Sequence, residues 1–129
     1  MVANIHNALN DLLNRQDIPL ETSIDRYFSP DYRQRTNGKW DDRTNFIQHI
    51  KHLRTLVKSV DIQVLNELRE GSNYATRHQV TAVKRDGTQV VMEVYLFAVM
   101  DQDGRFLRIE ETTLLLEGSE ADRGMGSAR

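Results

Sequence analysis

Two Asp-Gly pairs constrain this chain most strongly, because each lies between two runs of strand-forming residues. Asp86-Gly87 stands in the segment KRDGTQ and Asp103-Gly104 in the segment DQDGRF, and Val, Thr, Tyr, Phe and Leu dominate the flanking runs. An Asp-Gly pair in this setting is typical of a tight β-hairpin turn. We therefore predict three consecutive antiparallel strands between residues 74 and 117.

The same turns predict which residues face each other. If each Asp-Gly pair fills the two central positions of a two-residue turn, counting back brings His78 opposite Tyr95 and Tyr95 opposite Thr112. One face of the sheet then collects polar and ionisable side chains among apolar neighbours. Its members are His78, Tyr95, Glu93, Glu110 and Arg108, with Thr76 and Phe97 in the adjoining row.

Three of these residues predict a catalytic group. A histidine titrates near neutrality, so His78 suits the role of acid or base, with Tyr95 as hydrogen-bond donor and Glu110 orienting the imidazole. This interpretation requires their face of the sheet to be the concave one. On an outward face, the same mixture of side chains would be typical of a polar dimer interface.

Amphipathic segments precede the sheet. Apolar residues recur at helical spacing in residues 5–13, in residues 20–28 and in a third segment that ends near Val57. Between the second and third helices, the sequence predicts a short extended piece closed by an Asn37-Gly38 turn. From Val60 the apolar period changes to two, which predicts the first long strand of a four-stranded meander.

Bulk composition narrows the classes of protein. The 129 residues fit one domain, which we place at residues 1–118, followed by a C-terminal tail at 119–129 with little to bury. The chain has no cysteine, so disulfides and thiolate metal sites are excluded. Its 17 basic and 19 acidic residues give a net charge of −2, which favours neither nucleic acid nor an anionic membrane. Without a signal-like start or a long apolar run, a cytoplasmic protein is expected.

Aromatic residues around the second helix suggest a ligand. Tyr27, Tyr32 and Trp40 carry polar tips on flat rings, which suits either the rim of a pocket or the edge of the core. Together with Phe97 and Arg108 they are the predicted ligand-binding residues. The basic run at 49–58 is interpreted as a solvated helix face, and no metal site is predicted because His49 and His52 lack a third ligand.

The order of elements, with the phrases Phe28-Ser29-Pro30-Asp31-Tyr32 and Gly104-Arg105-Phe106, resembles the SnoaL-like branch of the nuclear transport factor 2-like superfamily over residues 3–118. The resemblance implies an α+β cone: three N-terminal helices on a strongly curved, mostly antiparallel sheet, with a pocket between them and a homodimer formed through the sheet. SnoaL-like cyclases carry a histidine before a Pro-Gly turn. This chain has Arg35-Thr36-Asn37-Gly38 there, which argues against cyclase activity.

The superfamily contains cyclases, isomerases, dehydratases and binding subunits without chemistry, so fold alone does not choose among them. We expect a pocket for a small, largely apolar or carbonyl-bearing molecule. One hypothesis is a cofactor-independent isomerase, cyclase or dehydratase that transfers a proton. The alternative is a non-catalytic ligand-binding or dimeric association module.

Overall fold

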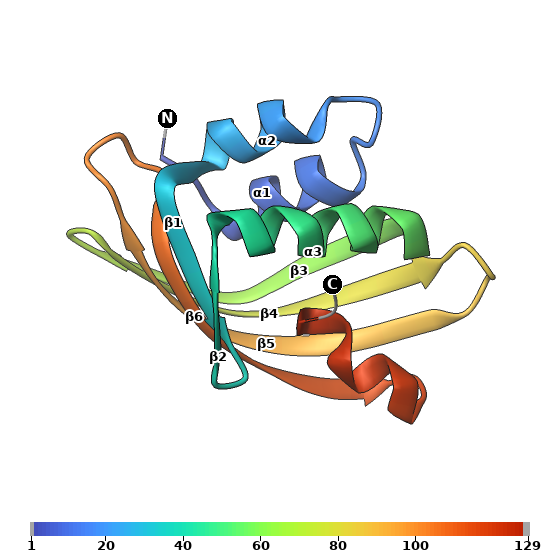
Figure 1. The fold of residues 1–129 in the computed structure, drawn as a ribbon. Coiled ribbons are helices and arrows are strands. Elements are labelled where there is room, and N and C mark those ends of the chain that lie inside the picture. Colours follow the sequence, from blue (N-terminus) through green and yellow to red (C-terminus); the bar gives the residue numbers. More distant parts are fainter. Residues whose placement is uncertain (1, 128–129) are drawn as a thin grey trace.

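A computed structural model describes residues 2–127 of the chain. Its elements, in chain order, are α1 (Ile5–Leu13), α2 (Leu20–Tyr27), β1 (Phe28–Thr36), β2 (Lys39–Asp42), α3 (Arg43–Leu56), β3 (Val57–Glu70), β4 (Asn73–Lys84), β5 (Gln89–Met100), β6 (Phe106–Glu117) and the 3₁₀ helix η1 (Glu120–Ser127). The sheet curves around the three α-helices, which lie on its concave side (Figure 1). The predicted α+β cone is confirmed.

The sheet holds six strands in the order β2-β1-β6-β5-β4-β3. The predicted meander corresponds to β3–β6, and β1 and β2 extend it beyond β6. Every neighbouring pair is antiparallel except β1 and β6, which run parallel. Asn37 and Gly38 form the turn between β1 and β2 with φ values of 52° and 86°, as a tight hairpin requires.

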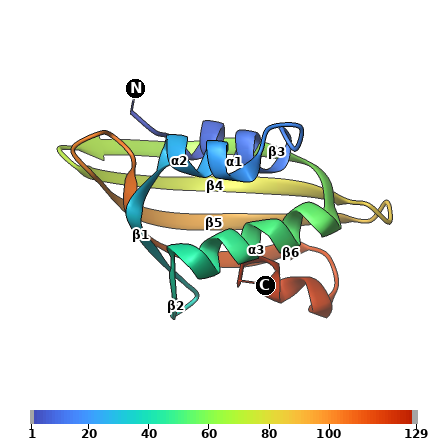
Figure 2. The ribbon, with the colours of Figure 1, turned by 45° about the horizontal axis from the view of Figure 1, so that its top comes forward.

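Apolar faces and caps explain the helices. Helix α1 buries Ile5, Ala8, Leu12 and Leu13 on one side and packs against β3, whereas α3 packs against β1 (Figure 2). The Asp42 carboxylate caps α3 by accepting a hydrogen bond of 2.8 Å from the backbone N–H of Asn45. The concave face and the inner helix faces together form the core.

The register predicted for β4 and β5 is wrong by one residue. The Lys84 N–H donates to the Thr88 carbonyl at 2.8 Å, so the loop between them has three residues and not two. Gly87 is the last of these, with φ at 91°, which suits a three-residue loop. His78 consequently pairs with Val94. A one-residue slip moves a side chain to the other face of a sheet, so His78 and Tyr95 lie on opposite faces.

The register predicted for β5 and β6 is confirmed, although the predicted two-residue turn is not what produces it. This hairpin also closes with a three-residue loop, in which Asp101 N–H donates to the Arg105 carbonyl at 2.8 Å. A register shift between Val99 and Met100 then restores the predicted parity. Tyr95 therefore faces Thr112, as expected.

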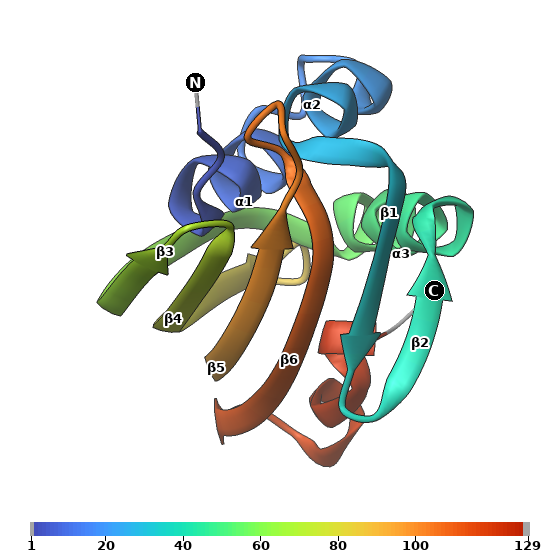
Figure 3. The ribbon, with the colours of Figure 1, turned by 90° about the vertical axis from the view of Figure 1, so that its left-hand side faces the viewer.

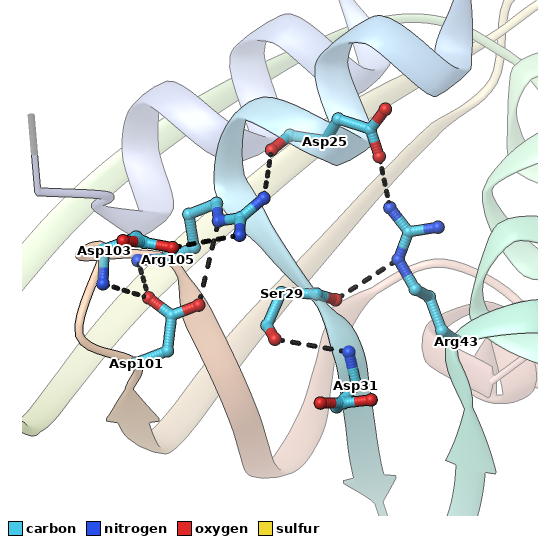
Figure 4. Close-up of polar contacts among 7 residues, drawn as sticks. All are labelled: Asp25, Ser29, Asp31, Arg43, Asp101, Asp103 and Arg105. Atoms are coloured by element: carbon cyan, nitrogen blue, oxygen red, sulfur yellow. Dashed lines mark hydrogen bonds and ion pairs between the residues drawn. The ribbon is translucent and has the colours of Figure 1, made fainter.

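Hydrogen bonds and ion pairs of arginines and aspartates connect α2 to α3 and to the β5–β6 hairpin at one end of the cone (Figure 4). Arg43 donates to the Asp25 carboxylate at 2.5 Å and to the Ser29 carbonyl at 3.2 Å. Arg105 donates to the Asp25 carbonyl at 3.2 Å, and the Asp101 carboxylate accepts from the Arg105 backbone N–H at 2.9 Å. These contacts join α2, α3 and the β5–β6 hairpin, so the helix layer has a fixed position over the sheet.

The segment predicted as a tail folds back on the sheet as far as the structure describes it. Helix η1 lies on the concave side, beneath α3 (Figure 3). Residues 128–129 of the predicted tail lie outside the described residues. Within residues 2–127, no helix has the length and apolar character needed to cross a membrane.

Candidate functional site

A cavity of about 130 Å³ lies between the concave face of the sheet and helices α1 and α3. Most of its wall is apolar, including side chains from both helices and from β3–β6. A cavity of about 150 Å³ accepts one benzene-sized ring, so this space suits a single small ring. The polar residues in its wall are Gln34, His49, His78, Glu111 and Thr113.

His78 reaches the cavity from the middle of β4 and is only 1% exposed. Its Nδ1 atom lies 2.8 Å from Oγ1 of Thr76, two residues earlier on the same face. Burial lowers the pKa of His78 to about 4, because the charged imidazolium loses hydration inside the fold. The ring is therefore neutral near pH 7 and suits a hydrogen-bonding role better than that of a strong base.

Glu111 reaches the same cavity from β6. Burial raises the pKa of Glu111 to about 7, although a hydrogen bond of 3.1 Å from the Thr36 hydroxyl lowers it in part. A carboxyl group with this pKa exchanges its proton readily at neutral pH, as a general acid or base must. Because Glu111 directly precedes Thr112 on the strand, the predicted register implied the opposite face from His78, and the observed register brings both to the cavity.

A chain of hydrogen bonds along β1 leads to Glu111. The buried Tyr32 hydroxyl donates to Oε1 of Gln34 at 2.8 Å, and Nε2 of Gln34 lies 3.4 Å from Oγ1 of Thr36. The Thr36 hydroxyl then donates to Oε1 of Glu111. Burial holds the pKa of Tyr32 well above its ordinary value, so its hydroxyl stays a donor. These hydrogen bonds fix the orientation of the Glu111 carboxyl group from the β1 side.

The two ionisable groups are too far apart to bond directly. His78 shares a row of the sheet with Val94 and Thr113, and Glu111 lies two residues before Thr113 on β6. Two strand spacings and two residues along a strand correspond to about 12 Å between the two backbones. Both side chains line the same cavity, so they share one space for a ligand.

His49 is a third ionisable residue in the wall, and its predicted position was wrong. Its place in a basic run predicted a solvated face of the third helix, whereas it is 5% exposed and lines the cavity. Its spacing does indicate burial, because His49 lies three residues after Phe46 and four before Leu53, on the buried stripe of α3.

The structure does not bring together the predicted group of His78, Tyr95 and Glu110. The one-residue shift places Tyr95 and Glu110 on the convex face, where they line a separate depression with the 73% exposed Phe97. Tyr95 donates a short hydrogen bond to Glu93, and Arg108 pairs with Glu110 at 3.5 Å. The predicted shared face is therefore wrong for His78, whereas Tyr95, Glu93, Glu110 and Arg108 do share one face.

The predicted aromatic rim also lies elsewhere. The Tyr27 hydroxyl donates to Asp11 at 2.5 Å, and Tyr32 anchors the β1 hydrogen-bond chain. Trp40 lies on β2, 44% exposed, with the Arg33 guanidinium 4.5 Å from its ring centroid. None of these three aromatic residues is part of the cavity wall. Across residues 2–127, no three metal-ligating side chains are grouped to hold an ion.

Solved structures with the same arrangement of elements define the class of this fold. A SnoaL-like polyketide cyclase candidate from Shewanella denitrificans superposes with a TM-score of 0.67 at 9% identity, over 83% of this chain and 85% of that one. A nuclear transport factor 2-like protein of unknown function from Exiguobacterium gives 0.64 at 16% identity, over 87% and 98%. The fold is thus that of the SnoaL-like proteins in the nuclear transport factor 2-like superfamily.

A sequence relative identifies the narrower family. An uncharacterized protein from Schizosaccharomyces pombe is 36% identical over 107 residues, which is 83% of this chain and 82% of that protein. No protein-family model matches the chain. The chain belongs to the family of this Schizosaccharomyces pombe protein.

Proposed function

We propose that the protein binds a small carbonyl-bearing molecule of about one ring in the concave cavity and transfers a proton within it. The observation that carries this proposal is an apolar cavity that holds two ionisable side chains, each with a pKa shifted toward its neutral form. Perturbed groups gathered in one pocket are typical of sites for acid and base chemistry. No cofactor is needed for such a reaction.

The two residues have different roles in this proposal. The Glu111 carboxylate takes a proton from the carbon next to the carbonyl group, and the electron pair of that C–H bond forms the C=C bond of an enolate. Charge then moves to the carbonyl oxygen, which accepts a hydrogen bond from Nε2–H of the neutral His78 imidazole. If the Glu111 carboxyl group first trades its proton with solvent, delivery of the new proton to the same carbon completes an exchange. Delivery to a different carbon of the enolate system completes an isomerisation.

Cyclohexanone is a suitable probe, because it combines one six-membered ring with a carbonyl group. In D₂O, we expect the protein to accelerate the loss of the NMR signal of the hydrogens on the carbon next to the carbonyl group. We also expect the chemical shifts of the backbone amides that flank His78 and Glu111 to change when cyclohexanone is added. The exchange rate in the presence of the Glu111→Gln variant should be at least about 100-fold lower than with the parent protein. Its matched control is Glu110→Gln, which changes the neighbouring residue on the convex face. Equal loss in both variants would refute the role of Glu111.

A second candidate function is association through the convex face. Tyr95, Phe97 and Leu114 are 40%, 73% and 48% exposed on neighbouring positions of β5 and β6. Exposed apolar side chains gathered in this way are typical of an interface. We therefore also propose the homodimer through the sheet that the resemblance implied.

Replacing Phe97 by Glu tests this dimer, because it places a charge at the most exposed ring of the patch. We expect the protein to sediment as a dimer and the variant to sediment as a monomer at the same concentration. Arg77→Glu is a useful comparison, since it changes charge on the same face without removing apolar area. A monomeric parent protein, or an unchanged dimer in the Phe97 variant, would count against this interface.

A further inference from the structure

Helix η1 separates the cavity from a second, outer groove. The groove has a volume of about 550 Å³ and lies between η1, the end of α3 and the β4–β5 hairpin, with His52, Leu56 and Arg85 in its wall. Met125 of η1 lines both the cavity and the groove. This side chain is thus part of the wall that divides the inner space from the outer one.

The attachment of η1 is local and specific. The Asp122 carboxylate accepts from Nζ of Lys84 at 2.8 Å and from the Ser119 backbone N–H at 2.9 Å, and Asp122 is 7% exposed. Met125 follows three residues later, and residues three apart lie on the same side of a 3₁₀ helix. Both side chains therefore face the body of the protein, whereas Ala121 and Arg123 are exposed.

Gly118 lets the chain fold back over the cavity. Its φ is 144°, in the region that favours glycine, and a Cβ atom there would lie 3.0 Å from Oδ2 of Asp122 and 3.3 Å from the Leu115 side chain. The close approach of Asp122 therefore depends on glycine at this position. The turn, the Lys84–Asp122 ion pair and Met125 form one structural unit.

We propose that η1 is a cover over the cavity, and that Met125 sets the upper size of the ligand and controls its passage from the outer groove. Methionine suits this position because its unbranched thioether side chain rearranges easily between conformers. A cavity of about 130 Å³ holds a single ring while Met125 fills its place. This inference rests on the proposed ligand site but goes beyond it, because it names the residue that selects among ligands.

Two ketones of different size test the selection. We expect the protein to bind cyclohexanone and to bind 2-tetralone, which has two fused rings, at least tenfold more weakly. Met125→Ala should strengthen 2-tetralone binding at least tenfold and change cyclohexanone binding less than threefold. Leu116→Ala, which truncates an exposed apolar residue near the end of β6, is the control and should change neither affinity. Unchanged 2-tetralone binding in Met125→Ala would overturn the role of Met125.

Amide hydrogen exchange tests the cover without any ligand. Lys84→Met removes the charge that holds Asp122, so we expect exchange in residues 119–127 to rise at least tenfold while the amides of β4–β6 stay unchanged. Exchange that stays the same in η1 would overturn the cover. If neither ketone binds the parent protein, the proposed function fails, and the exchange result still decides whether η1 opens.

Discussion

The Glu111 carboxyl group is expected to cost the folded protein about 3 kcal/mol of stability as pH rises from 4.5 to about 7, and Glu111→Gln should remove this cost. The pKa of Glu111 is about 7 in the folded protein and 4.5 as the ordinary value. Between these two pH values, the unfolded chain has released the proton that the folded chain still holds. The contribution of Glu111 to stability therefore falls as pH rises from 4.5 and becomes constant above about 7.

Urea unfolding at several pH values measures this effect. The difference in unfolding free energy between Glu111→Gln and the parent protein should move in favour of the variant by up to about 3 kcal/mol across this range. Glu110→Gln is the control, since its side chain lies on the convex face with Arg35 and Arg108. A pH-independent difference for Glu111→Gln would contradict a buried, proton-retaining carboxyl group.

His78 is expected to contribute the opposite slope over nearly the same pH range. Its pKa is lowered from 6.5 to about 4 in the folded protein, so the unfolded chain takes up a proton first as pH falls. The contribution of His78 to stability should therefore be lost between pH 6.5 and pH 4, by about 3 kcal/mol in total, and stay constant below that. Glu111 has the opposite slope over nearly the same range, so each effect is measured as the difference between one variant and the parent protein.

The His78→Gln variant should lack this acid-side loss and should also slow cyclohexanone exchange by at least about 100-fold. The exposed His6 is the matched control, and His6→Gln should keep both properties of the parent protein. A variant that keeps the acid-side loss would place its origin outside His78. If His78→Gln slows cyclohexanone exchange while the fold stays intact, His78 has a chemical role that is distinct from its role in stability.

The sequence predicted the cone fold well, because its signals are local and repeated. Helical spacing in residues 5–13 and alternation from Val60 onward each depend on many side chains, so single errors do not change the element. The parallel pairing of β1 with β6 was not predicted, since it joins segments far apart in the chain and no turn connects them.

The candidate site was predicted less well, because its membership depends on single residues of register. The Arg85–Gly87 loop has one residue more than predicted, so Tyr95 and His78 lie on opposite faces. The next hairpin also has a three-residue loop, but a register shift near Val99 compensates for it, so the predicted pairing of β5 with β6 is still correct. A two-residue and a three-residue loop both accept Asp-Gly, so the dipeptide does not distinguish them. His78, which the sequence singled out, does lie in the cavity wall, whereas its neighbours across the cavity depend on a register that the sequence did not reveal.

The most direct test of the proposed site is a crystal structure of the protein with cyclohexanone. We predict that the ring lies inside the concave cavity, with its carbonyl oxygen about 3 Å from Nε2 of His78 and its neighbouring carbon facing the Glu111 carboxyl group. A ketone bound instead in the convex depression beside Tyr95 and Phe97, with the cavity holding no ligand, would contradict it.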